Sequence, residues 1–240
     1  GRWAAGRSGA LRTTVMRLGV TRLGLVLSLA GAAACGGSQR APELNVLLVV
    51  IDTLRADRLG CYGNARGITP CIDRLAEQAL LFEAASAHAP WTLPSTASLL
   101  TSLVPEQHGA GGRLGAFTRL DRDLPTLASH FQDAGYATAA VVNVSFLGPD
   151  FGLARGFEHH DLVAFESNRK LRRADATTEA ALAWLAEARD ERPFFLLVHY
   201  FDPHAVYDPP QPFRARFALE PDRNDPSFVF GTRAEMMELR

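Results

Sequence analysis

The sequence has 240 residues, of which 47% are hydrophobic, and its formal net charge is −1 at pH 7. A chain of this size can bury one sizeable core or two small ones. Its only lysine is Lys170, and its arginines are mixed with acids along the chain, so the charge pattern excludes a surface built to bind nucleic acid.

Residues 1–40 have the pattern of an export signal followed by a tether. Arg12, Arg17 and Arg22 precede the apolar segment 23–34, which is too short for a comfortable membrane span and fits the apolar region of a signal peptide. The small residues 32–34 lead to Cys35, an arrangement that resembles a bacterial lipoprotein signal with a lipidated cysteine. The alternative is an ordinary signal peptide cleaved after an A-x-A site. Both interpretations predict export to the periplasm or cell envelope, and the first adds a membrane anchor at Cys35.

The remaining residues, 41–240, are expected to form one incomplete catalytic domain of α/β class. The short apolar run Asn45–Ile51 predicts a strand buried on both faces, as in the middle of a parallel sheet. Apolar spacing and end signals predict further strands over 81–87, 136–144 and 194–199, and helices over 69–80, 95–102, 124–134 and 175–189. Strands that alternate with helices indicate a central, mostly parallel sheet flanked by helices.

The last part of the chain predicts a domain that is not finished at residue 240. Segment 205–230 is rich in Pro, Asp and Phe and shows little periodicity, whereas 232–240 is typical of a helix that has only begun. We therefore interpret the chain as an N-terminal fragment of a longer protein.

Asp52 ends the first predicted strand, which is where open α/β sheets place their ligands. A carboxylate in this position can also cap the following turn through its side chain. The local pattern alone leaves both interpretations open.

Four segments, taken in order, resemble the N-terminal half of the sulfatase family within the alkaline-phosphatase-like superfamily. They are DTLRADRLGCYG (52–63), TPCIDRLAEQALLFEAASAHAPWTLPSTASLLTS (69–102), PEQHG (105–109) and HYFDPHAVYDPP (199–210). The resemblance implies an α/β fold around a large central sheet. It also implies one divalent cation, usually calcium, and hydrolysis of sulfate esters or related phosphate and phosphonate esters.

The resemblance places the metal at Asp52 and Thr92. Asp52 matches the first carboxylate of the family's metal pair, and Thr53 stands where a second carboxylate is often found. Calcium and magnesium prefer hard oxygen ligands, so we expect calcium, with magnesium or manganese as alternatives. Further ligands are expected beyond residue 240, from an Asp followed by His or Asn.

Thr92 also stands where the family carries the residue that is converted to formylglycine. Oxidation of a threonine would leave a ketone, so no formylglycine is expected. Related phosphotransferases use an unmodified threonine here, and a helix N-terminus with a metal would favour its alkoxide. We therefore predict Thr92 as the nucleophile. The alternatives are that Thr92 only caps the helix or that the site is degenerate.

Histidines complete the predicted site. His204 follows Asp202-Pro203, and in the family a histidine at this place contacts the sulfuryl group or assists the leaving group, whereas the alternative is a surface histidine in a turn. His108 is expected to be structural, and His159 and His160 to lie exposed in a loop. The Lys and His with which the family holds the anion are missing from 140–145, where Asn143 is only a weak substitute.

These observations predict a metal-dependent hydrolase of sulfate, phosphate or phosphonate esters that acts on a small molecule, glycan or lipid. The alternative function is a catalytically silent domain of the same fold that binds anionic glycans or lipids. We expect the side-chain oxygens of Asp52 and Thr92 to converge, with His204 facing the same cavity. Cys61 and Cys71 are ten residues apart, and a bridge between them would add roughly 2–3 kcal/mol, the alternative being two thiols.

Overall fold

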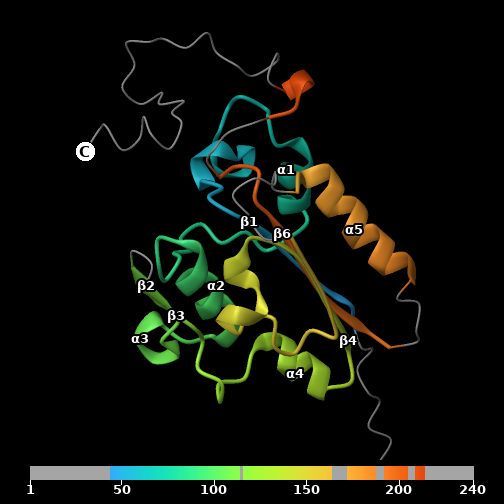
Figure 1. Cartoon of the computed structure of the whole chain (residues 1–240). Coiled ribbons are helices and arrows are strands. Elements are labelled where there is room, and N and C mark those ends of the chain that lie inside the picture. The colour runs from blue at the N-terminus through green and yellow to red at the C-terminus, as the bar shows by residue number, and fades with distance from the viewer. Residues whose placement is uncertain (1–43, 114–115, 164–171, 188–191, 205–208, 214–240) are drawn as a thin grey trace, which may run out of the picture. The chain divides into compact units, whose positions relative to one another are not determined.

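The structure is a computed structural model that describes residues 44–113, 116–163, 172–187, 192–204 and 209–213 (Figure 1). All of them belong to the unit Glu43–Arg240. The predicted export signal, Cys35 and the helix over 232–240 lie outside the described residues, as does most of segment 205–230.

The described residues form a parallel sheet with the strand order β1-β6-β4-β5. These strands are β1 (Val46–Ile51), β6 (Phe194–Tyr200), β4 (Ala137–Asn143) and β5 (His159–Val163). A small antiparallel pair, β2 (Gly111–Arg113) and β3 (Ala116–Thr118), lies outside this sheet. The central parallel sheet flanked by helices confirms the predicted α/β class.

Four of the described α-helices begin and end within a few residues of the predicted positions, and the short helix Pro105–His108 was not predicted. They are α1 (Pro70–Ala76), α2 (Thr92–Thr101), α3 (Pro105–His108), α4 (Leu127–Asp133) and α5 (Ala174–Glu187). Pro70 occupies the first turn of α1, where its missing amide costs nothing. Thr126 caps α4 by accepting a hydrogen bond from the Ser129 amide at 3.1 Å. None of the described helices is long and apolar enough to cross a membrane.

Each face of the sheet buries its own apolar cluster. On one face, Leu93, Ala97 and Leu100 of α2 pack against residues of β1, β4 and β6. On the other, Ala181 and Trp184 of α5 pack against residues of β4 and β6. The ribbon view shows α2 and α5 on opposite sides of the strands (Figure 1). Residues 45–52 therefore alternate between the α2 face and the opposite face.

The prediction that β1 is buried on both faces is wrong for the described part of the chain. Leu48 and Val50 pack into the α2-side cluster, but Leu47 and Val49 are 56% and 49% exposed. β1 is an end strand of the sheet, and α5 covers β4 and β6. A continuous apolar run shows that both faces of a strand can be buried. It does not show which helix or strand packs against each face.

Two further predictions were also wrong. Residues 81–87 form no strand. The Tyr62 hydroxyl donates a hydrogen bond to the Phe82 carbonyl at 2.7 Å. His159 and His160 lie in β5 rather than in a loop, and His160 is half-buried with Nε2 3.1 Å from the Leu147 carbonyl. Burial lowers the pKa of His160.

Candidate active site

The site begins where the parallel strands β1 and β6 end together. Ile51 pairs with Tyr200, and the Asp52 amide continues the ladder by donating to the Tyr200 carbonyl at 2.9 Å. Asp52 has the same alternation as Leu48 and Val50, which points its side chain to the α2 face. The carboxylate therefore stands at the carboxyl edge of the sheet, where α/β folds bind their ligands.

Thr92 meets Asp52 across this edge. It is the first residue of α2, and its Oγ1 donates a hydrogen bond to Asp52 Oδ2 at 2.9 Å. The predicted convergence of the two side-chain oxygens is confirmed. The capping interpretation of Thr92 is wrong, because the cap position is Trp91 and no side chain caps the helix. The Asp52 carboxylate likewise bonds to Thr92 rather than to the turn that follows it.

His199 is the residue that the sequence analysis missed. It pairs in register with Val50, and its Nε2 lies 3.6 Å from Asp52 Oδ2. Its side chain is only 1% exposed, and neither ring nitrogen has a hydrogen-bond partner. One signal could have found it: His199 is a polar residue near the end of a buried apolar strand, where the neighbouring parallel strand also ends in a carboxylate.

The surroundings of Asp52 favour its ionised form. Burial alone raises the pKa of Asp52, but the contact with His199 and the Thr92 hydrogen bond outweigh that cost. Electrostatic attraction to His199 and His204 adds to the effect, so the pKa of Asp52 lies below its usual 3.8. At neutral pH the site therefore presents a carboxylate, which suits a cation.

His204 lies in the turn that follows β6. Its amide donates to the Phe201 carbonyl at 2.8 Å, and its half-buried imidazole stacks on the Phe201 ring with centroids 4.3 Å apart. The Phe201 ring in turn lies 6.4 Å from the ring of His199. The structure thus groups Asp52, Thr92 and His199, and it sets His204 one aromatic ring away from His199.

Asn143 supports the sheet and has its amide fully engaged. It is completely buried at the end of β4 and donates to the His199 carbonyl at 2.6 Å and to Thr177 Oγ1 at 3.1 Å. Its Oδ1 accepts from Arg172 Nε at 3.1 Å. Both hydrogen bonds that the Asn143 amide can donate are therefore used within the protein, and none is left for an anion.

The donor set fits a divalent cation in part. Asp52 Oδ2 and Thr92 Oγ1 are hard oxygen donors, and the buried Nε2 of His199 faces the same carboxylate without a partner. In the part of the chain that the structure describes, no three His, Cys, Asp or Glu side chains gather into a metal-binding group. These three residues thus offer only part of a coordination shell.

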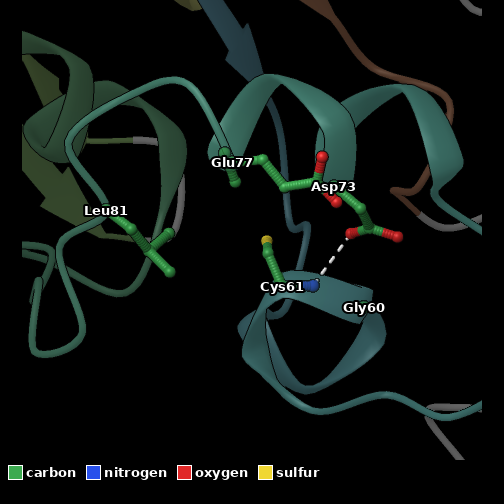
Figure 2. A pocket seen from close by; sticks show the side chains of 6 residues that line it. Gly60, Cys61, Asp73, Glu77 and Leu81 are labelled. Carbon is green, nitrogen blue, oxygen red and sulfur yellow. Dashed lines mark hydrogen bonds between the residues drawn. The ribbon is translucent and has the colours of Figure 1, made fainter.

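A hollow of about 430 Å³ lies elsewhere, between residues 60–61 and the helix α1. Figure 2 shows the Asp73 carboxylate directed at the Cys61 amide, which donates to it at 2.8 Å. Cys61 and Cys71 are both free thiols, which is the second of the two alternatives that the sequence left open. The hydrogen bond from the Cys61 amide to Asp73, rather than a disulfide, connects the helical turn Gly60–Tyr62 to α1.

Comparison with known proteins identifies the family. The sulfatase family model matches residues 44–228, and the chain belongs to this family. A Delta 4,5-hexuronate-2-O-sulfatase of Bacteroides thetaiotaomicron is 31% identical over 186 residues, which cover 73% of this chain and 38% of that protein. Human iduronate 2-sulfatase is 30% identical over 243 residues, covering 84% of this chain and 43% of that protein. The chain spans less than half the length of these relatives.

Solved structures agree with this assignment. A 2-O GAG sulfatase has a TM-score of 0.55 and 29% identity, over 68% of this chain and 35% of that protein. The phosphonate monoester hydrolase of Agrobacterium radiobacter has a TM-score of 0.59 over 73% of this chain and 44% of that protein. At 21% identity, this second likeness shows the fold alone.

Proposed function

We propose that the protein is a metal-dependent hydrolase of sulfate, phosphate or phosphonate esters in which unmodified Thr92 is the nucleophile. The observation that carries this proposal is the 2.9 Å hydrogen bond from Thr92 Oγ1 to Asp52 Oδ2 at the carboxyl edge of the sheet. A hydroxyl at the start of a helix and beside an ionised carboxylate supports the proposal, because such a pair could share a divalent cation and such a hydroxyl could attack an anionic ester.

The substrate class follows from the relatives and from the chemistry of Thr92. Two of the relatives are named for removing sulfate from uronates, and the sulfatase assignment favours an anionic glycan or small-molecule sulfate. Thr92 cannot become formylglycine, so phosphate and phosphonate esters are equally part of the proposal. We further propose that the protein is exported and that calcium, magnesium or manganese serves as the cation.

The residues then divide the reaction between them. The anionic group of the ester binds at the N-terminus of α2, whose amides and dipole favour negative charge. Thr92 Oγ1 gives its proton to Asp52 Oδ2, which accepts its hydrogen bond, and attacks the phosphorus or sulfur atom while the bond to the leaving oxygen breaks. His204 gives a proton to that oxygen. Water then hydrolyses the threonyl ester, restores the hydroxyl and releases the inorganic anion. Asp52 and Thr92 would hold the cation, which would lower the pKa of the attacking hydroxyl and offset charge on the ester.

The proposal is tested in the full-length protein with aryl sulfate, phosphate and phosphonate esters. Thr92→Ala should abolish turnover, and Thr92→Ser, which keeps the hydroxyl, should retain measurable activity. Thr101→Ala is the matched control, because Thr101 lies at the other end of the same helix, where its hydroxyl donates to the Ala97 carbonyl at 2.7 Å and accepts from the Leu103 amide at 3.3 Å. Mass spectrometry with a slow substrate should find the transferred group on Thr92.

Two results would contradict this function. Full activity in Thr92→Ala would remove Thr92 from the chemistry. Failure of the wild-type protein to turn over any of the three ester classes, with retained binding of a sulfated glycan, would instead support the catalytically silent binding domain.

A further inference from the structure

The buried imidazole of His199 makes no hydrogen bond within the described part of the chain. Among the described residues, its Nδ1 and Nε2 are the buried side-chain atoms that lack a hydrogen-bond partner. Leaving a buried polar group unpaired costs free energy, and such groups are rare enough in native proteins to need an explanation. A ligand that contacts the imidazole would supply one.

The unpaired imidazole is directed at the candidate site. Nε2 lies 3.6 Å from Asp52 Oδ2, the same oxygen that accepts the Thr92 hydrogen bond. This separation is too long for a hydrogen bond. It is, however, about the span of two metal–ligand bonds of roughly 2.0–2.2 Å that meet at one ion. The imidazole nitrogen and the Thr92 hydroxyl therefore both lie close to one carboxylate oxygen of Asp52.

The backbone holds His199 in this place. Its strand is fixed by the parallel pairing with β1, and its carbonyl accepts the 2.6 Å hydrogen bond from Asn143. The side chain is 1% exposed, so the ring cannot satisfy its nitrogens by turning to solvent. The imidazole is thus preorganised for a partner between itself and Asp52.

We propose that His199 Nε2 is a direct ligand of the cation that Asp52 and Thr92 hold, an inference that rests on the proposed function. Calcium and magnesium take oxygen ligands, whereas imidazole suits zinc and other transition metals. The proposal therefore adds one nitrogen ligand to the two oxygen donors, and Zn²⁺, which imidazole suits, is the probe of choice beside Ca²⁺.

The experiment measures metal binding and needs no turnover. Full-length protein, stripped with a chelator, is titrated calorimetrically with Zn²⁺ and with Ca²⁺, and the visible absorption of bound Co²⁺ is recorded. Loss of outer-shell partners costs about 10–100-fold in metal affinity, so His199→Gln should weaken Zn²⁺ binding by at least about 100-fold and shift the Co²⁺ spectrum. The exposed His159 gives the matched control, and His159→Gln should change neither.

The variants separate the possible outcomes. Glutamine can still donate a hydrogen bond to Asp52, so unchanged Zn²⁺ affinity and Co²⁺ spectrum in His199→Gln would overturn the proposal. If Asp52→Asn abolishes binding in the same experiment, the cation site of the proposed function stands without His199. Zn²⁺ binding that survives both substitutions would defeat both proposals. If His199→Gln does not fold, His199→Ala is used, and added imidazole should restore Zn²⁺ affinity. Failure of that rescue in a folded variant would count against direct ligation.

Discussion

Asn143 holds the backbone of His199 through a side-chain hydrogen bond of 2.6 Å to its carbonyl, which ties β4 to β6 beside the site. The same amide bonds to Thr177 of α5 and to Arg172. One buried residue therefore links two strands and a helix at the carboxyl edge of the sheet. The position of the His199 imidazole depends on this link.

Replacing Asn143 by alanine should lower the free energy of unfolding, although the substitution removes only a few atoms. Asn143→Ala leaves the His199 carbonyl and the Thr177 hydroxyl without this partner, at about 1–3 kcal/mol for each buried group that is not re-satisfied. We expect the free energy of unfolding to fall by at least about 2 kcal/mol, as measured by urea denaturation. Asn64→Ala removes two exposed hydrogen bonds, one to the Asp57 carbonyl and one from the Arg66 amide, and should change the free energy of unfolding by less than about 1 kcal/mol. Equal losses in the two variants would contradict this account.

His108 should make the protein lose stability as the pH falls. The ring is fully buried, Nδ1 accepts from the Ala110 amide at 3.0 Å, and Nε2 lies 3.0 Å from Ser98 Oγ. Burial lowers the pKa of His108 below its usual 6.5, so the unfolded chain binds this proton more readily than the folded one. The contribution is therefore complete above pH about 6.5 and declines below it, by at most about 1.4 kcal/mol per pH unit.

The test compares urea unfolding of the wild type and His108→Gln between pH 5 and 8. The wild type should show the steeper decline below pH about 6.5, because glutamine has no proton to gain. His159→Gln serves as the control, because it makes the same substitution at an exposed ring. Parallel stability curves for the wild type and His108→Gln would show that the buried neutral ring is not responsible.

The two cysteines should behave as thiols. Cys71 is exposed and Cys61 is half-buried, and both are free in the structure. We expect native protein to react with a thiol reagent at both positions, with Cys71 modified first. Replacing Cys71 by alanine should change the free energy of unfolding by no more than about 0.5 kcal/mol, as for other surface positions. A native protein that reacts only after reduction would restore the disulfide prediction.

Lipidation at Cys35 stays a prediction, since residue 35 lies outside the described part of the chain. Cys35→Ala in the precursor, produced in a bacterial host, should release the protein from the membrane fraction into the periplasm. Fractionation followed by immunoblotting measures the shift. Unchanged membrane association would mean that segment 23–34 is retained as an anchor.

The sequence predicted the order of the elements well, because buried strands and amphipathic helices carry local patterns. It also predicted the meeting of Asp52 and Thr92, since both were recognised in ordered family segments. His199 was missed because its importance arises from pairing with Val50, a contact between residues far apart in the chain. The same limit explains β1, whose apolar run could not show which neighbour covers each face.

The exposure of Leu47 and Val49 has a practical consequence for handling the chain in solution. β1 ends the described sheet, and apolar side chains beside an unpaired strand edge offer a template for strands of other molecules. The 240-residue chain should consequently be prone to aggregation at high concentration. Val49→Lys would place a charge on that exposed face, well before the carboxyl edge where Asp52 stands. Such gatekeeping charges are how natural proteins keep open edges soluble.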